Sequence, residues 1–128
     1  MQIYGIGVDS TTISRIEKSM ARPGFLEKCF GAEEQTLFLH SRPETVAANF
    51  AAKEALSKAL GTGLFGFVFS EVQVLRKEGG APYFAFNGAM KQNMIQQKLT
   101  AHLSLTHEGS YATAFVILEK ESNNDYSQ

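Results

Sequence analysis

The sequence has little that would mark a secreted, membrane-bound or nucleic-acid-binding protein. Its single cysteine, Cys29, excludes an internal disulfide, and its 12 lysines and arginines nearly balance 13 aspartates and glutamates, so no overall basic field favours nucleic acid. We find no signal-peptide pattern and no apolar run long enough to cross a membrane. We therefore expect a cytoplasmic protein in which Cys29 is an unreactive thiol, with neither a membrane nor a nucleic acid as partner.

Several common catalytic and metal-binding motifs are also absent. No cysteine pair and no His-x-x-x-His spacing occurs, which excludes the usual zinc sites, and there is no serine nucleophile elbow. Gly61, Gly63 and Gly66 do spell G-x-G-x-x-G, but the dinucleotide fingerprint must follow a strand and open a helix, whereas these glycines close one. His40 and His102 have no supporting context, and we interpret them as structural.

The chain is nevertheless long and apolar enough to fold as one domain. It has 128 residues, 44% of them apolar, and no internal repeat or linker. The mixture of helical and strand patterns predicts a single α+β unit with an antiparallel sheet and one long helix. We expect residues 1–120 to form the domain and the polar residues 121–128 to form a disordered tail.

Hydrophobic periodicity, caps and turn residues predict the order of the elements. The predicted strands are Gln2–Val8, Ser70–Lys77, Pro82–Asn87, Thr100–Thr106 and Tyr111–Glu119. The predicted helices are Thr12–Arg22, the short segment Phe25–Phe30, Glu33–Ser41, a long helix that Pro43 opens, and Gly88–Gln97. The cluster Asp9–Thr12 is suited to capping the first helix, and Glu78–Ala81 and His107–Ser110 are predicted to turn two hairpins.

The end of the long helix combines an acid, a base and a glycine turn. Glu54 and Lys58 lie one turn apart on the same face, where Ala47 and Ala51 are too small to cover them, so we expect that face to be open to a ligand. With a turn of exposed backbone N–H groups after the helix, these groups suit a metal ion beside a phosphate. The alternatives are an ordinary surface ion pair and an ordinary glycine helix stop.

Asp9 is a second candidate, at the end of the first predicted strand. An aspartate there is often a helix cap, but Ser10, Thr11 and Thr12 compete for that role. Asp9 is then available to join Glu54 in a metal site. Two carboxylates suffice for Mg²⁺, which fills its other positions with water and phosphate oxygens.

Two further features lie on other elements. Strand alternation aligns His107 with Leu103 and Leu105, at the end of an apolar row, and the alternative to a functional role is a histidine of the core. On the first helix, a cationic stripe lies opposite an apolar row, and it suits either an acidic partner or simple solvation. The stripe is Arg15, Lys18 and Arg22, and the apolar row is Ile13, Ile16 and Met20.

These features are common singly, but their order along the chain is specific. The segments are Gly5-Ile-Gly-Val-Asp9, Phe50-Ala-Ala-Lys-Glu-Ala55 with Lys58-Ala-Leu-Gly-Thr-Gly63, and Leu103-Ser-Leu-Thr-His107. With them, the chain resembles the holo-acyl-carrier-protein synthases, the small 4′-phosphopantetheinyl transferases, from about Ile3 to Leu118. That resemblance implies the α+β fold of this family. It also implies transfer of the 4′-phosphopantetheine arm of coenzyme A to a serine of apo acyl carrier protein, with Mg²⁺ required and 3′,5′-ADP released.

The resemblance further implies how the site is assembled. Family members form homotrimers with each active site between two subunits, and larger relatives hold two such halves in one chain. This chain corresponds to one half, so we expect its site to need a second copy, with Asp9 and Glu54 converging across a subunit boundary. Asp9 and Glu54 match the metal-binding carboxylates of the family, and Lys58 matches the lysine that approaches the transferring phosphate.

The remaining family positions concern coenzyme A and the carrier. The turn Gly61, Thr62 and Gly63 matches the segment that meets coenzyme A, together with Lys58. Thr106 and His107 match the motif that lines the nucleotide pocket. Arg15 matches an arginine of the helix that docks the acidic carrier, and we extend that role to the rest of the cationic stripe, Lys18 and Arg22.

The sequence departs from the family pattern in three places. Asn49 stands where an arginine usually precedes the phenylalanine, which leaves one anionic contact without its usual residue. Ala81 replaces a longer polar residue, so a contact from this hairpin to the nucleotide is expected through the backbone only. The segment between Asp9 and Glu54 is shortened near Pro23 and Gly24, so the carrier-docking surface is expected to differ. Competing hypotheses are an Mg²⁺-dependent nucleotide pyrophosphatase and a trimeric carrier-binding module without catalysis.

Overall fold

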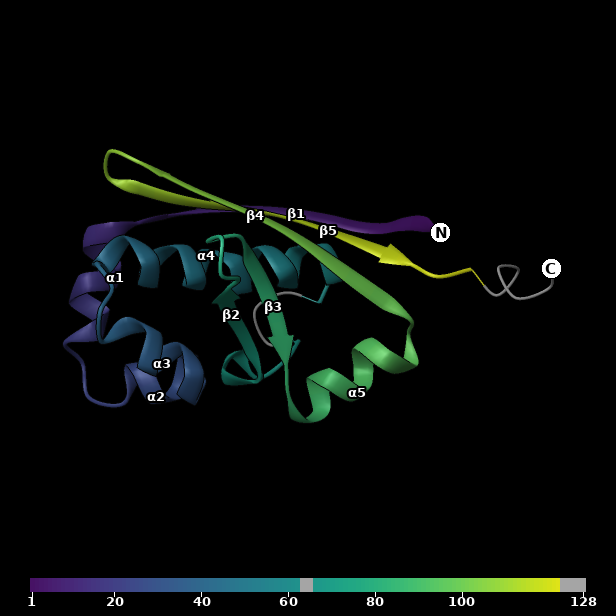
Figure 1. Cartoon of the computed structure of the whole chain (residues 1–128), viewed down its shortest axis with the longest axis horizontal. Coiled ribbons are helices and arrows are strands. Elements are labelled where there is room, and N and C mark those ends of the chain that lie inside the picture. The colour runs from purple at the N-terminus through teal and green to yellow at the C-terminus, as the bar shows by residue number, and fades with distance from the viewer. Residues whose placement is uncertain (63–65, 123–128) are drawn as a thin grey trace.

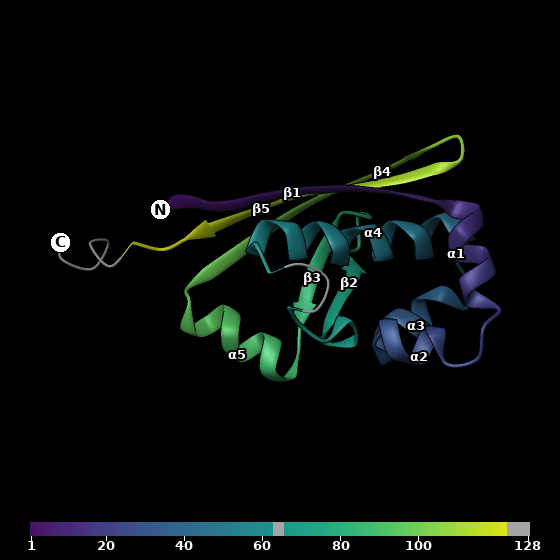
Figure 2. The ribbon, with the colours of Figure 1, turned by 180° about the vertical axis from the view of Figure 1, so that it is seen from behind.

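The computed structural model describes residues 1–62 and 66–122. In chain order the elements are β1 (Gln2–Thr12), α1 (Ile13–Met20), α2 (Phe25–Cys29), α3 (Ala32–Phe38), α4 (Pro43–Leu60), the 3₁₀ turn η1 (Phe69–Glu71), β2 (Val72–Arg76), β3 (Pro82–Phe86), α5 (Gly88–Gln96), β4 (Leu99–Glu108) and β5 (Tyr111–Lys120). The long sheet lies along one side of the molecule and α4 runs beneath it (Figure 1). Seen from behind, α1, α2 and α3 gather at one end of α4 and α5 lies toward the other (Figure 2). The predicted α+β fold with antiparallel sheets and one long helix is confirmed.

The main sheet has the strand order β1-β5-β4, and both neighbouring pairs are antiparallel. Side chains alternate between the face on α4 and the opposite face. Asp9 lies opposite Ala114, which in turn lies opposite Leu105, so these three residues share the face that packs on α4. The predicted alignment of His107 with the apolar row of β4 is confirmed by this register.

Two glycines allow β1 to lie directly on the backbone of α4. A Cβ atom at Gly7 would fall 1.9 Å from the carbonyl oxygen of Ala55, and one at Gly5 would fall 1.8 Å from that of Ala59. The expectation that small residues leave this helix open to a ligand is therefore wrong: Ala47 and Ala51 are fully buried. The small side chains of α4 instead let other chain segments approach closely.

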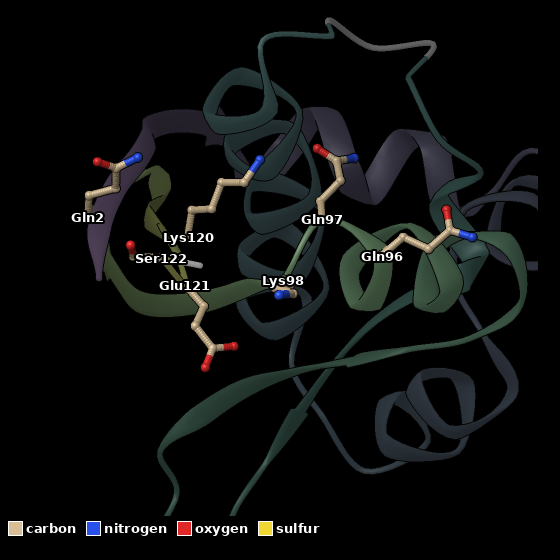
Figure 3. Close-up of a pocket in the computed structure, with 7 residues that line it drawn as sticks. All are labelled: Gln2, Gln96, Gln97, Lys98, Lys120, Glu121 and Ser122. Carbon is tan, nitrogen blue, oxygen red and sulfur yellow. The ribbon is translucent and has the colours of Figure 1, made fainter. Parts of the chain in front are cut away.

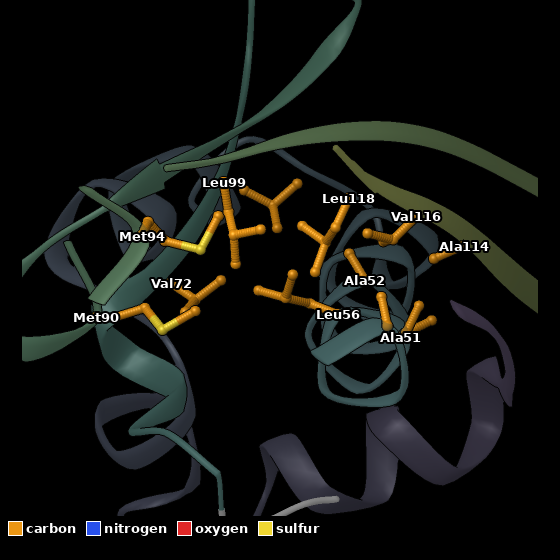
Figure 4. Packing of buried hydrophobic residues seen from close by; sticks show 13 residues of the cluster. Ala51, Ala52, Leu56, Val72, Met90, Met94, Leu99, Ala114, Val116 and Leu118 are labelled. Carbon is orange, nitrogen blue, oxygen red and sulfur yellow. The ribbon is translucent and has the colours of Figure 1, made fainter. Parts of the chain in front are cut away.

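The larger apolar core lies between α4, the long sheet, the hairpin β2–β3 and α5 (Figure 4). Its members are alanines and Leu56 of α4, valines of β2, methionines of α5, Leu99 of β4 and the inward residues of β5. The β2–β3 pairing confirms the predicted hairpin across residues 78–81. Because α4 supplies mostly alanines, bulky residues on the other elements fill the space.

A second cluster joins α1, α2 and α3 to the first half of α4. Phe30 is its centre: its ring contacts those of Phe25, Phe38 and Phe50 at centroid distances of 5.9, 4.9 and 6.4 Å. Ile13 and Ile16 are buried here, as predicted for the apolar side of the first helix. The short segment predicted at Phe25–Phe30 is helical over Phe25–Cys29.

The structure corrects two local predictions. The first strand does not end at Val8 but continues to Thr12, because Ser10, Thr11 and Thr12 pair with residues of β5. No side chain caps α1, since Thr12 occupies the N-cap without a side-chain hydrogen bond and Ser10 Oγ lies 2.7 Å from Thr113 Oγ1. The predicted strand at Ser70–Lys77 is shorter, because Phe69–Glu71 forms a 3₁₀ turn.

The other predicted boundaries agree to within one to three residues. Across residues 1–62 and 66–122, no helix combines the length and apolarity that a membrane span requires. Gly63, and all but the first two residues of the predicted tail, lie outside the described residues.

Candidate active site

Asp9 and Lys58 meet where β1 lies on the last turns of α4. Lys58 Nζ is 3.1 Å from Asp9 Oδ1 and also donates to the carbonyl oxygen of Val8 at 3.0 Å. The Asp9 side chain is only 15% exposed and that of Lys58 is 56% exposed. The ammonium can therefore swing to a ligand while the carboxylate stays in place.

Glu54 brings a second carboxylate to Asp9. Burial, the charge of Asp9 and a hydrogen bond with Asp9 raise the pKa of Glu54 from 4.5 to about 7, while Arg15 and Lys58 act in the opposite direction. Two half-buried carboxylates this close repel one another unless a proton or a cation lies between them. The expectation that they converge across a subunit boundary is wrong, because they meet within one chain.

This pair fits a divalent cation. Asp9 and Glu54 supply hard oxygen ligands, and their close approach is the arrangement that a bound cation would stabilise. Residues 1–62 and 66–122 contain no cluster of three or more His, Cys, Asp or Glu side chains that could hold a metal. A cation here would therefore take most of its ligands from water and substrate, as Mg²⁺ commonly does.

An apolar cavity of about 550 Å³ opens beside Glu54. Aromatic rings form much of its wall: Phe50 and Phe69 lie 5.8 Å apart, and Phe67 stacks on Phe69 at 5.3 Å. Arg15 of α1 also lines the cavity, with its guanidinium carbon 5.9 Å from the Phe50 ring centroid. The carboxylate pair thus lies next to a space that suits an uncharged, extended chain.

The glycine turn after α4 differs from the expected cradle of free donors. Gly61 has φ = 77°, its N–H donates to Lys58 O at 3.0 Å, and the Thr62 N–H donates to Ser57 O at 3.2 Å. This is the left-handed helix stop that was the alternative interpretation. These two N–H groups already have partners, so binding of coenzyme A at Gly61 and Thr62 stays a prediction without that support.

Thr106 and His107 line a separate pocket of about 240 Å³, together with Glu44, Thr45, Ala48, Arg76, Gly80, Pro82 and Leu105. None of Asp9, Glu54 and Lys58 lines it. His107 is exposed, so the interpretation of this histidine as a core residue is wrong. Within one chain, the predicted nucleotide-binding residues and the carboxylate pair thus form two distinct sites.

The cationic stripe is exposed as expected. Arg15 and Lys18 lie on the outer side of α1, whereas Arg22 lies in the turn beyond the helix and donates to Ser19 Oγ at 2.8 Å. Arg15 therefore belongs both to this stripe and to the cavity beside Glu54. Through Arg15, the cationic stripe therefore reaches the cavity that Glu54 also lines.

Sequence reasoning missed a buried ionic network beneath the site. Lys53 Nζ lies 2.7 Å from Glu34 Oε1 and also donates to the carbonyl oxygens of Phe69, at 3.0 Å, and Val72. Burial lowers the pKa of Lys53 and raises that of Glu34, and each charge opposes the effect of burial on the other. Asn49 donates to Glu34 Oε2 at 3.0 Å. The charged Lys53 within an alanine-rich helix was the one available sequence signal.

A polar pocket of about 520 Å³ lies at the opposite end of the molecule (Figure 3). Its side chains come from the start of β1, from the end of α5 and the two residues after it, and from the end of β5 and the two residues after it. They are Gln2, Gln96, Gln97, Lys98, Lys120, Glu121 and Ser122. None of the predicted site residues lines it.

Comparisons with known proteins show the family to which this chain belongs. The model of the 4′-phosphopantetheinyl transferase superfamily matches residues 5–116. The holo-[acyl-carrier-protein] synthase of Clostridium perfringens is 42% identical over 130 residues, which cover 93% of this chain and 96% of that protein. The holo-[acyl-carrier-protein] synthase of Herminiimonas arsenicoxydans is 41% identical, and the match covers 93% of this chain and 99% of that protein.

Solved structures give the same result. The holo-[acyl-carrier-protein] synthase of Neisseria meningitidis superposes with a TM-score of 0.85 at 33% identity, over 93% of this chain and all of that one. The synthase of Bacillus anthracis, solved in complex with CoA (3′,5′-ADP), gives a TM-score of 0.79 at 32% identity, over 94% of this chain and all of that one. With these matches over nearly its whole length, the chain belongs to the holo-[acyl-carrier-protein] synthase family of the 4′-phosphopantetheinyl transferase superfamily.

Proposed function

We propose that this enzyme transfers the 4′-phosphopantetheine group of coenzyme A to a serine of an apo acyl carrier protein, with Mg²⁺ bound and 3′,5′-ADP released. The observation that carries the proposal is the meeting of Asp9 and Glu54 beside Lys58, at the mouth of an apolar cavity. Family membership supports the reaction class, and the Bacillus anthracis complex supports coenzyme A as its donor.

The residues suit the charge that develops in this reaction. Attack of a serine hydroxyl on the β-phosphate builds negative charge on the diphosphate oxygens, so the protein must position groups and neutralise charge. Asp9 and Glu54 would hold the cation, which supplies Lewis-acid stabilisation of those oxygens when bound. Lys58 is exposed, and among the described residues its ammonium is held by Asp9 and Val8 O, so it would turn to the transferring phosphate.

The surroundings of the carboxylate pair suit the two other parts of the reaction. The aromatic cavity beside Glu54 offers an apolar wall to the pantetheine arm. Arg15, Lys18 and Arg22 offer a cationic approach for an acidic carrier, with Arg15 reaching the edge of that cavity. The carrier serine would then enter between α1 and the last turns of α4.

We also propose that the chain assembles as a homotrimer through the open face of its long sheet. Ile6 and Val8 of β1 and Phe115 of β5 are 55%, 54% and 41% exposed on that face, an apolar surface that is unusual for a monomer. Neither Asp9 nor Glu54 of the same chain lines the pocket at Thr106 and His107. A neighbouring copy would bring the two half-sites together.

The test is a mass-spectrometric transfer assay. Purified protein, apo carrier, coenzyme A and Mg²⁺ are expected to give a carrier heavier by one phosphopantetheine group, and Asp9→Ala or Glu54→Ala should lower the rate by at least about a hundredfold. Glu78→Ala removes an exposed carboxylate from the β2–β3 turn and should leave the rate unchanged. Release of free phosphopantetheine without a carrier would instead indicate a pyrophosphatase, and an unmodified carrier would contradict the transfer.

A further inference from the structure

Arg76, at the end of β2, provides a cation that neither the sequence motifs nor the family pattern pointed to. Its guanidinium donates through Nη2 to Asn49 Oδ1 at 2.8 Å and through Nη1 to Leu75 O at 3.4 Å. A guanidinium has five N–H groups, so most of its donors remain available. Within the described part of the chain, Arg76 has no ion-pair partner.

Asn49 holds this guanidinium in place. Its Nδ2 donates to Glu34 Oε2 at 3.0 Å and to Val74 O at 2.9 Å, so the amide is fixed and its Oδ1 must accept from another residue. Asn49 is fully buried and cannot itself reach a ligand. Asn49 stands where the family pattern has an arginine, and in this chain it orients Arg76 of β2 through a hydrogen bond.

The guanidinium lines the same pocket as Thr106 and His107. Arg76 is half-buried: burial lowers the pKa of its guanidinium, and the charge of Glu34 acts in the opposite direction. Glu44 and Thr45 also line the pocket and provide hydrogen-bond acceptors. The pocket thus combines a guanidinium that forms no direct ion pair among the described residues with acceptor groups, which suits a nucleoside that carries a single phosphate.

Coenzyme A has such a phosphate. Its diphosphate would lie at Asp9, Glu54 and Lys58 under the proposed function, which leaves the 3′-phosphate of the ribose as the remaining anion. We propose that Arg76 binds the ribose 3′-phosphate of coenzyme A and so takes over, from β2, the contact that Asn49 cannot make from α4. This inference rests on the proposed function and assigns a specificity-determining residue to it.

The first experiment compares coenzyme A with dephospho-coenzyme A, which lacks only the 3′-phosphate. The unmodified enzyme is expected to prefer coenzyme A, and Arg76→Gln should raise KM for coenzyme A by about 10- to 100-fold while KM for dephospho-coenzyme A stays constant. Lys77→Gln removes the adjacent exposed lysine, which does not line the pocket, and should change neither value. Equal shifts for both donors, or no shift, would overturn the inference.

The second experiment needs neither a carrier nor catalysis. Calorimetry should show that the unmodified protein binds adenosine 3′,5′-bisphosphate more tightly than adenosine 5′-monophosphate. Arg76→Gln should bind the two nucleotides with equal affinity. If that preference is found while no carrier is modified, the transfer reaction fails and this inference stands. If the carrier is modified but Arg76→Gln keeps the preference, only this inference fails.

Folding of the variants is checked by circular dichroism and thermal melting. If Arg76→Gln does not fold, Arg76→Lys replaces it, because an ammonium cannot make two parallel N–H bonds to a phosphate. The preference for the bisphosphate should then fall severalfold, and an undiminished preference would overturn the assignment.

Discussion

At the scale of single residues, Glu54 loses its proton near neutral pH, well above the range in which most glutamates lose theirs. Its pKa of about 7 results first from burial and then from the neighbouring carboxyl of Asp9. Under the proposed function, a proton and a divalent cation compete for the same oxygens. Metal binding should release protons near pH 7, and metal affinity should rise as the pH rises through that value.

This competition predicts a pH dependence of stability. Because the pKa of Glu54 in the folded protein lies above its ordinary value of 4.5, the folded state binds more protons than the unfolded chain between these values. The contribution of Glu54 to the free energy of unfolding should therefore fall as the pH rises from about 4.5 to 7 in metal-free buffer.

Thermal melts in the presence of a chelator measure this effect. The melting temperature of the unmodified protein should fall over that range relative to Glu54→Gln, which cannot titrate. Mg²⁺ should raise the melting temperature of the unmodified protein more at pH 8 than at pH 6, and have little effect on the variant. Parallel pH profiles for the two proteins would contradict the assignment.

At the scale of elements, the packing of β1 on α4 depends on glycine. A methyl group at Gly7 would meet the backbone of Ala55 and Ala59, which cannot rotate away. Gly7→Ala should therefore lower the free energy of unfolding by about 1–3 kcal/mol or more. Gly79→Ala is the matched control, because a Cβ atom there meets nothing within 4 Å. Chemical denaturation of both variants checks the difference.

The elements also differ in how far the sequence could predict them. Both ends of α4 were predictable, because Pro43 occupies its first turn and Gly61 takes the left-handed conformation. The extension of β1 to Thr12 was not, because threonine and serine suit caps and strands equally well, and only pairing with β5 decides between them.

The candidate site shows the same division. Local motifs found Asp9, Glu54 and Lys58, and the structure brings all three together. The contact of Glu34 with Lys53 could not be predicted, because it depends on how α3, α4 and β2 pack, and neither residue has a local partner. Arg76 was missed for the same reason, since its importance depends on Asn49, 27 positions away.

At the scale of the whole molecule, the proposed trimer depends on the exposed apolar face of the long sheet. Light scattering should give three times the monomer mass of 14.1 kDa. Phe115→Glu places a charge in the centre of that face and should shift the protein to monomers. Leu39→Glu is the control, because Leu39 is 76% exposed beyond the end of α3, away from the sheet. A monomeric unmodified protein at micromolar concentration would contradict the trimer.

The contact between Gly7 and Ala55 has a consequence for chemistry as well as for folding. Asp9 follows Gly7 by two residues and Glu54 precedes Ala55 by one, so the gap between strand and helix sets the spacing of the two carboxylates that we propose as metal ligands. A single methyl group added at Gly7 would increase the distance between β1 and α4, and with it the distance between the carboxylates of Asp9 and Glu54. Ion capture should then weaken at temperatures where the widened protein is still folded, with every acidic ligand still present.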